Sequence, residues 1–149
     1  MLMKELCNGN VVVCDAQTSA SQAASLMRHR HVGDVVIVDD VREEGVPLGV
    51  VTDRDLVIEV MGKGLDPAKV AVGGLMKRPV VVAHESEDTS TVIERMRSNG
   101  VRRIPVVAGE GHVVGIVSLT DLLGALVTDA KGLLDAMAKA YHKEQHTRL

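Results

Sequence analysis

Valine-rich runs alternate with more polar stretches along most of the 149-residue chain. Short runs of β-branched residues are typical of strands, and apolar residues spaced three or four apart are typical of helices. In the first half this pattern predicts strands near 11–13, 35–38 and 48–51 and helices near 19–30 and 53–61. In the second half it predicts strands near 80–82, 104–107 and 113–117 and helices near 89–99 and 119–127. The order strand, helix, strand, strand, helix therefore occurs twice.

The two halves are an internal repeat, because their distinctive residues recur at nearly constant spacing. Met27 recurs as Met96, 69 residues later, and Asp55 recurs as Asp121, 66 residues later. One repeat of about 60 residues has only a marginal core by itself, whereas two repeats packed face to face can share one. We therefore predict an α/β (α+β) protein in which two repeats, related by a local twofold axis, pack together through their sheets.

The chain divides where the copies begin and end. Repeat 1 covers residues 1–62, a linker with several Gly residues covers 63–74, and repeat 2 covers 75–128. The apolar residues of 129–149 stand at helical spacing, which predicts an amphipathic C-terminal helix with a frayed tail from residue 142. We expect this helix to pack on its own domain or on a second subunit.

Composition excludes several classes of protein. Apolar residues make up 46% of the chain and charged residues 25%, which is typical of a globular domain. The chain has no Phe, no Trp and one Tyr, so it cannot recognise bases by aromatic stacking. Its net charge of −3 has the wrong sign for neutralising a phosphate backbone. We therefore expect no nucleic-acid partner.

The hydropathy pattern also argues against a membrane. No apolar run approaches the ~20 residues that cross a bilayer, and the first residues lack the apolar segment of a signal peptide. We expect a cytoplasmic protein with no membrane partner.

Candidate chemistry lies in a hydroxyl and a carboxylate that occur together in both repeats. Thr52 and Asp55, and likewise Ser118 and Asp121, follow a Val-rich strand and open a helix. The first helical turn presents free N–H groups to an anion such as phosphate, and a carboxylate can accept the hydroxyl protons of a ribose. The same pattern is also that of a capping box, in which both side chains satisfy helix-end donors. From the residues alone, a nucleotide site and a structural cap both stay open.

The doubled pattern resembles the tandem cystathionine-β-synthase (CBS) domain pair, also called a Bateman module. The similarity covers residues 2–127 and is carried by the Val-rich first strand, the helix ending in Met27 or Met96, the Ile-Pro-Val-Val strand at 104–107 and the two Gly-initiated [Thr/Ser]-x-x-Asp motifs. It implies a stand-alone regulatory module for signal transduction that senses adenosyl nucleotides in the clefts between its repeats. The ligands implied are AMP, ADP, ATP, NAD-type dinucleotides or S-adenosylmethionine, and the assembly implied is a homodimer.

The resemblance also implies roles for individual residues, position by position. Asp55 and Asp121 match the acid that binds ribose. A phosphate-binding role is implied for Thr52, Ser118, Arg102 and Arg103. A base-binding role is implied for Val11, Pro79, Val80 and Pro105.

Repeat 1 departs from this pattern at one position. Asp34 stands where repeat 2 has Arg103, so a site that uses this position for phosphate has an acid instead. Repulsion between a carboxylate and a phosphate favours a neutral or ribose-like group beside Asp34. We therefore expect one good site, or two sites with different ligands.

Other classes of function compete with this interpretation. A ligand-free module for dimerisation or for docking a partner would need the same residues only as caps. An enzyme is not expected, since the chain has no Gly-x-Ser-x-Gly motif and no P-loop. His29 and His31 are flanked by arginines and lack a third ligand, so we expect no metal site and no catalytic cofactor. We expect the regulated protein to be a separate chain.

Overall fold

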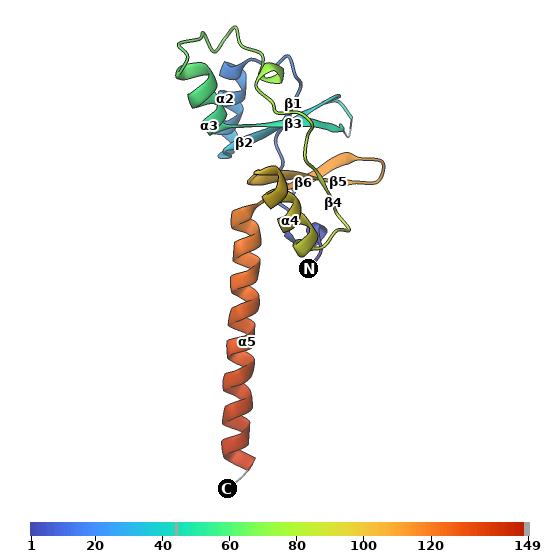
Figure 1. Cartoon of the computed structure of the whole chain (residues 1–149), viewed down its shortest axis with the longest axis vertical. Coiled ribbons are helices and arrows are strands. Elements are labelled where there is room, and N and C mark those ends of the chain that lie inside the picture. Colours follow the sequence, from blue (N-terminus) through green and yellow to red (C-terminus); the bar gives the residue numbers. More distant parts are fainter. Residues whose placement is uncertain (44, 148–149) are drawn as a thin grey trace.

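The computed structural model describes residues 1–43 and 45–147, which form two similar units and one long helix (Figure 1). The elements of the first unit and of the linker are, in chain order, α1 (Met3–Leu6), β1 (Val13–Cys14), α2 (Ala20–Arg30), β2 (Asp34–Val38), β3 (Pro47–Thr52), α3 (Asp53–Leu56), the π-helical turn η1 (Val57–Met61) and the 3₁₀ turn η2 (Val72–Gly74). Those of the second unit are β4 (Ala83–His84), α4 (Thr89–Asn99), β5 (Arg103–Ala108), β6 (His112–Ser118) and α5 (Leu119–Thr147).

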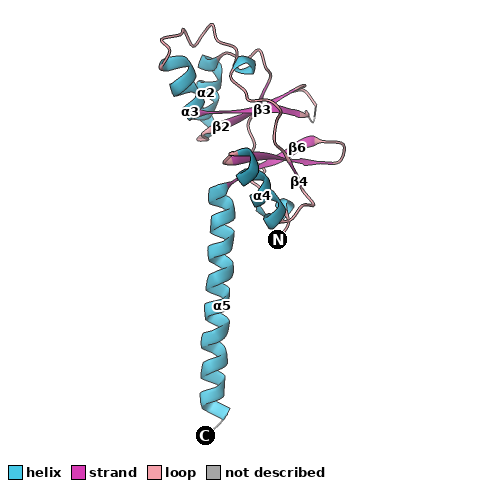
Figure 2. Cartoon of the chain, in the orientation of Figure 1, coloured by secondary structure: helices cyan, strands magenta, loops and turns pink. Residues whose placement is uncertain are grey.

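Each unit contains a three-stranded sheet, in the orders β1-β2-β3 and β4-β5-β6. In both sheets the first pair of strands is parallel and the second pair is antiparallel. The sheets face each other, with α2 and α3 outside one sheet and α4 outside the other (Figure 2). This arrangement confirms the predicted α+β fold of two repeats packed through their sheets.

Both faces of each sheet are apolar, because successive strand residues point in opposite directions. In β2, Val35 and Ile37 join the core beneath α2, while Val36 and Val38 are equally buried on the face toward the second sheet. The second unit repeats this pattern, and its helix-side core consists of Met3, Ala83, Val92, Met96, Ile104, Val106, Val117 and Leu122. Burial on both faces explains why β2 and β5 are apolar almost throughout.

Two segments pack on the unit to which they do not belong in sequence. Near the N-terminus, Met3 is fully buried in the second core, and Asn8 exchanges two backbone hydrogen bonds of 2.9 and 3.1 Å with Ile116. In return, Val72 and Met76 lie in the first core. The predicted boundaries at residues 62, 74 and 128 follow the sequence copies, and the packing crosses them.

Two glycines at equivalent positions permit this exchange. Gly49 lies against Met76, and Gly115 lies against Cys7. A Cβ atom at Gly49 would come within 2.6 Å of Met76, and one at Gly115 would come within 2.7 Å of the Cys7 sulfur. Glycine is required at both positions because the crossing segment approaches the strand backbone too closely for a side chain.

The first strand of each repeat is shorter and later than predicted. The Val runs at 11–13 and 80–82 were expected to be strands, but the paired residues are Val13–Cys14 and Ala83–His84. The preceding valines run beside the sheets without joining a ladder, and Val12 is 4% exposed. The other unpaired valines, at 11 and 80–82, are half-buried, so these runs report full or partial burial rather than pairing, which a β-propensity cannot distinguish.

The C-terminal region is one continuous helix rather than two. The sequence predicted a helix at 119–127 and a separate terminal helix with a frayed tail, whereas α5 runs unbroken from Leu119 to Thr147. Its 29 residues span about 43 Å at 1.5 Å per residue. No proline interrupts it, and Gly124 and Gly132 weaken a helix without ending it. The last two residues of the predicted tail, 148 and 149, lie outside the described residues.

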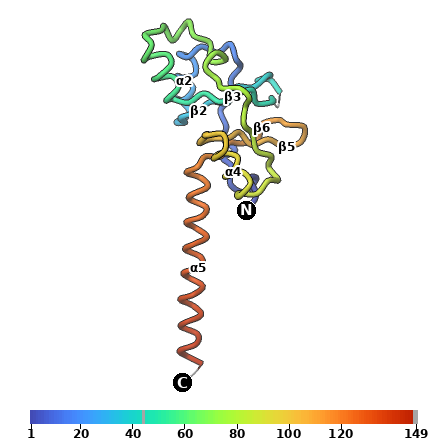
Figure 3. Tube along the Cα trace, viewed as in Figure 1, coloured from blue at the N-terminus to red at the C-terminus, as the bar shows by residue number. Residues whose placement is uncertain are grey.

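Beyond residue 125, every described residue of α5 is exposed. The helix points away from both units, and the C-terminal end is the most distant part of the molecule (Figure 3). One of the two predicted positions for this segment, packing on its own domain, is therefore wrong.

Candidate functional site

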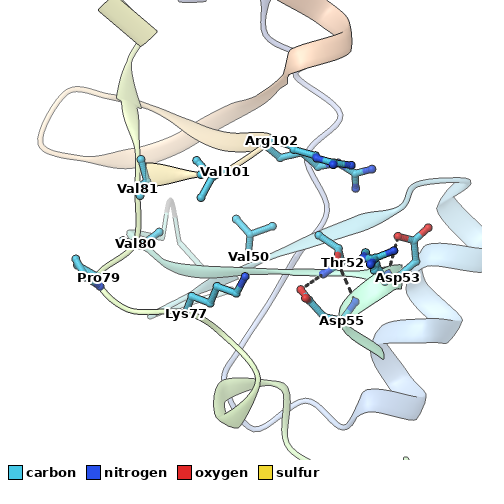
Figure 4. A pocket seen from close by; sticks show the side chains of 13 residues that line it. Val50, Thr52, Asp53, Asp55, Lys77, Pro79, Val80, Val81, Val101 and Arg102 are labelled. Carbon is cyan, nitrogen blue, oxygen red and sulfur yellow. Dashed lines mark hydrogen bonds between the residues drawn. The ribbon is translucent and has the colours of Figure 1, made fainter. Parts of the chain in front are cut away.

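Two clefts lie between the repeats, and each is lined by the start of a helix from one repeat and by loops of the other. The first has a volume of about 620 Å³ (Figure 4). Its lining comprises Val50, Thr52, Asp53, Arg54, Asp55, Lys77, Pro79, Val80, Val81, Gly100, Val101, Arg102 and Arg103. This volume is in the range of cofactor and small-molecule sites.

Thr52 and Asp55 hold the start of α3 at one end of the first cleft. The Thr52 hydroxyl oxygen accepts a hydrogen bond from the Asp55 amide at 3.1 Å, and the amide of Thr52 donates to Asp55 Oδ2 at 2.9 Å. The capping box is therefore formed. No described residue makes a hydrogen bond to the other carboxylate oxygen of Asp55, and the side chain is only partly buried. One oxygen of Asp55 therefore stays available to a ligand hydroxyl.

Apolar side chains line the middle of the first cleft. Val80, Val81 and Val101 come from repeat 2 and lie across the cleft from Val50 on β3 (Figure 4). The segment that carries Val80 and Val81 is held in place next to the cleft, because Arg95 donates a 2.9 Å hydrogen bond to the carbonyl of Val82. These valines give this part of the cleft an apolar lining, and the space between Val50 and Val80 is called the slot below.

Cations flank this slot. Lys77 extends from the linker side toward the end that holds Thr52 and Asp55, and Arg102 reaches over from repeat 2 (Figure 4). With Arg54 and Arg103, four cations line the cleft against two carboxylates, Asp53 and Asp55. The cleft therefore has an excess of positive charge, which suits a phosphate.

The second cleft is smaller and more polar, with a volume of about 360 Å³. Ser118 and Asp121 form the same capping box at its edge, with hydrogen bonds of 2.9 and 3.1 Å, but Asp121 is exposed. The rest of the lining comprises Asn8, Asn10, Val32, Gly33, Asp34, Arg102, Arg103, Ile116, Leu119 and Thr120. Two cations and two carboxylates leave this cleft with no excess of positive charge.

An ion pair between the repeats joins the two clefts. Arg103 donates from Nη1 to Asp34 Oδ2 and to the carbonyl of Gly33, both at 2.9 Å. Burial raises the pKa of the Asp34 carboxyl, and the charge and hydrogen bond of Arg103 oppose this rise. The sequence predicted that Asp34 would face a ligand and repel phosphate. Instead Asp34 is bound by Arg103, so it also occupies a cation that a phosphate would otherwise contact.

The predicted site residues are distributed between the two clefts. The first cleft contains Thr52, Asp55, Pro79 and Val80, and the second contains Ser118 and Asp121. Arg102 and Arg103 line both. Val11 and Pro105 line neither, and Pro105 is buried in β5. Their assignment to the base is not supported by this placement.

Sequence reasoning missed Lys77, Asn8 and Asn10. A signal for them was present, because the 69-residue offset that relates the first strands also relates Asn8 to Lys77 and Asn10 to Pro79. Comparing the repeats position by position upstream of the Val runs would have shown that the second cleft lacks both the lysine and the proline.

No helix within the described residues is long and apolar enough to cross a membrane.

Comparison with known proteins identifies relatives of the chain. The sequence is 34% identical over 119 residues to an uncharacterized protein of Methanopyrus kandleri, a match that covers 80% of this chain and 59% of that protein. It is 29% identical over 143 residues to Hypoxic response protein 1 of Mycobacterium tuberculosis, covering 92% of this chain and 96% of the relative. This chain therefore spans less than two thirds of the Methanopyrus protein and nearly all of the mycobacterial one.

Among solved structures, the chain is similar to the CBS domain pair of protein MJ0100 in complex with 5′-methylthioadenosine and S-adenosyl-L-methionine. The TM-score is 0.74 at 25% identity, over 87% of this chain and 98% of that one. The sequence model of the CBS domain matches residues 3–62 and 72–128. These two matched segments correspond to the two repeats, and the chain therefore belongs to the CBS domain family as a tandem pair.

Proposed function

We propose that this protein is a regulatory module that senses an adenosyl nucleotide, and that its main ligand site is the first cleft. The ligand candidates are AMP, ADP, ATP, an NAD-type dinucleotide and S-adenosylmethionine. Asp55 binds the ribose hydroxyls, the slot between Val50 and Val80 holds the adenine, and Lys77 with Arg102 binds the phosphate or another polar end of the ligand.

A single observation carries this proposal: one cleft brings together a partly free carboxylate, an apolar slot and surplus positive charge. These are the groups that a ribose, an adenine and a phosphate need, in a space of suitable size. The bound ligands in the MJ0100 pair are adenosine derivatives, which agrees with this choice of ligand class.

Thermal unfolding with each candidate ligand tests the proposal. A ligand at 100 times its Kd stabilises the folded state by about 2.7 kcal/mol, which raises the Tm of a domain of this size by several degrees. Calorimetric titration then gives the Kd and the number of sites. No shift with any of the five ligands would refute the proposal, and loss of intact nucleotide on long incubation would refute a role limited to binding.

A ligand-free interaction module is the second candidate, because both capping boxes are formed in the structure. If capping is the only role of these residues, Ser118→Ala costs about 1 kcal/mol of stability and no nucleotide changes the Tm. Asp55→Asn separates the two candidates, because an Asn side chain still accepts the Thr52 amide but carries no charge for a ribose. Weaker nucleotide binding at unchanged stability supports the sensing module.

A further inference from the structure

The C-terminal part of α5 has no packing partner within the described chain. From Leu126 onward, its large apolar side chains are between 52 and 68% exposed, namely Leu126, Val127, Leu133, Leu134, Met137 and Tyr141. In proteins, most of the stability of a helix comes from tertiary packing of its apolar face rather than from helix propensity. A 29-residue helix with such a face therefore needs a partner.

These residues follow a heptad pattern. Leu126, Ala130, Leu133, Met137 and Ala140 are separated alternately by four and three residues. Val127, Leu134 and Tyr141 continue the apolar surface along one edge, each one heptad apart. The opposite face carries the polar residues Thr128, Lys131, Asp135, Lys139 and His142. A seam of this period fits against another helix with the same pattern.

We propose that this seam is the interface between two copies of the chain, in which the α5 helices pack antiparallel about a twofold axis at residue 135. The homodimer implied by the family resemblance thereby gains a defined interface outside the CBS repeats. The proposal does not depend on nucleotide binding.

Charge selects the antiparallel direction. Asp129 and Lys143 lie on the edge of the seam opposite to Leu134, and each is one heptad away from Ala136. With the axis at 135, Asp129 lies six residues from the axis and the partner's Lys143 lies eight, so the two levels differ by about 3 Å along the helix, which long side chains on the same edge can span, and the twofold axis repeats this pair. In a parallel pair each would instead face the apolar edge of the other helix, and no opposite charges would meet.

Side-chain size fits the proposed register. With the axis at 135, Leu133 faces the partner's Met137, and Ala130 faces the partner's Ala140. On the edge, Leu134 lies within two residues of the level of its own copy, and Val127 lies within two residues of the level of the partner's Tyr141, so these large side chains adjoin across the interface. The small Ala layers are therefore flanked by large edge residues, which keeps the interface filled.

The position of the globular units also limits the register, because a deeper overlap of the two helices would collide with repeat 2. In this register the end of one α5, at residue 147, reaches the level of residue 123 on its partner. A shift of one heptad inward would place residues 141–147 opposite 116–122, where β6 and the buried Leu122 belong to repeat 2. In the proposed register Glu144 lies opposite Leu126 at the end of the overlap, whereas a shift of one heptad outward would set Glu144 opposite Leu133 and leave Leu126 without a residue of the partner opposite it. The proposed register therefore gives the largest apolar overlap without collision.

The mass of the full chain in solution, measured by light scattering after size exclusion, tests the interface. We expect at least two chains for the wild type and half that mass for Leu133→Glu combined with Met137→Glu. Since both side chains are 67 to 68% exposed, the repeats of the double variant should still fold, which urea unfolding of the repeats checks. A monomeric wild type, or an unchanged mass of the double variant, would overturn the proposal. A monomer that sediments with lipid vesicles would assign the seam to a membrane instead.

Charge reversal tests the direction. Lys143→Glu places two acids together at each end and should weaken the dimer about tenfold, and adding Asp129→Lys should restore it. Lys139→Glu makes the same charge change on the outer face and serves as the matched control. Equal effects of the two lysine variants, or no rescue by Asp129→Lys, would refute the antiparallel pairing.

Oxidative crosslinking tests the register. Leu134→Cys should form a disulfide-linked dimer on oxidation, because residue 134 lies within two residues of the level of its copy near the axis. Asp135→Cys, which points outward, should not. Crosslinking of the second variant but not the first would exclude this register.

Discussion

The two clefts are built from copies of the same sequence, yet the first is lined by more cations than carboxylates and the second by equal numbers of each. The first has Lys77, Pro79 and a fourth cation, Arg54, whereas the second has Asn8 and Asn10 at the positions equivalent to Lys77 and Pro79. The equivalent of Arg103 in repeat 1 is Asp34, and the structure pairs these two residues with each other. The structure that both repeats share therefore positions each cleft, and the few residues that differ between the repeats determine the charge of its lining.

This comparison separates what the fold requires from what the ligand requires. The capping boxes and the close-packed glycines, Gly49 and Gly115, are the same in both repeats because each repeat needs them to fold. The residues around the slot differ between the repeats, and the proposed function assigns that difference to the ligand. Substitutions of single residues in each cleft test this comparison directly.

The largest expected effect is on ligand affinity at Asp55. Asp55→Asn removes the charged acceptor of the first cleft and should weaken binding of AMP by about 30-fold, or about 2 kcal/mol, the usual value for hydrogen bonds to a charged group. Calorimetric titration of both proteins measures the change.

Asp121→Asn is the matched control, because it makes the same change in the same motif of the second cleft. Asp121→Asn should raise the Kd of AMP at the tighter of its sites by less than threefold. A larger loss of affinity for Asp121→Asn than for Asp55→Asn would show that the ligand prefers the second cleft, and would reverse the comparison.

The next effect concerns the ion pair that joins the repeats. Arg103→Ala leaves the carboxylate of Asp34 partly buried without its cation and should cost about 1.5 kcal/mol of stability at neutral pH. Burial raises the pKa of Asp34, and without Arg103 this pKa rises further because the charge and hydrogen bond that oppose the effect of burial are lost. The loss should therefore shrink as the pH falls through this raised pKa, since a protonated carboxyl needs no cation. Urea unfolding across a pH series measures it.

Arg102→Ala provides the control, because Arg102 is exposed and its side chain has no hydrogen bond within residues 1–43 and 45–147. Its stability should stay within about 0.5 kcal/mol of the wild type, as is usual for surface substitutions. If both variants lose equal stability, the pair with Asp34 is not the cause.

The sequence predicted the fold in most respects, because the signals for the fold are local and occur twice. The strand and helix pattern, the helices predicted at 19–30 and 89–99 and the packing of the two sheets all follow from residue order and from the need to share a core. The boundaries of the first strands were wrong because Val11 and Val80 are apolar without pairing in a sheet, and Val80 lines the first cleft instead.

The candidate site was less predictable, because it depends on contacts between distant residues. Thr52 and Asp55 were found since they stand together in a motif, whereas Lys77 joins them only through the fold. The pair of Arg103 with Asp34 links residues 69 positions apart, and no local pattern reports such a contact. The packing exchange of Met3 and Met76 between the units was missed for the same reason.

A smaller effect is expected behind the wall of the first cleft. Arg95, which holds the carbonyl of Val82, is itself bound by Glu87, and repeat 1 has Leu26 and Thr18 at the positions equivalent to these two charged residues. Hydrogen bonds from Arg95 lower the pKa of Glu87 below its ordinary value of 4.5. The stabilisation is therefore complete above pH 4.5 and disappears as the pH falls through the lowered pKa.

Glu87→Gln should consequently cost about 1 kcal/mol at pH 7 and progressively less below pH 4.5, as measured by urea unfolding. Glu94→Gln is the control, because Glu94 and Arg97 form an exposed pair whose side chains are 58 and 77% accessible. Exposed pairs contribute little. A pH-independent loss in Glu87→Gln would mean that packing, rather than charge, supports this wall.

The smallest expected effect is a gain of affinity, and it tests the comparison of the two clefts most directly. Asp34→Asn weakens the hold on Arg103, which lines both clefts, and so releases a cation toward the first. Binding of AMP should become about threefold tighter, or about 0.6 kcal/mol, a value within the range for partly exposed ion pairs. Adenosine lacks the phosphate and should bind both proteins equally. If adenosine gains as much as AMP, or if AMP binds more weakly, Arg103 does not divide its charge between the two clefts, and the difference between them must come from Lys77 and the slot alone.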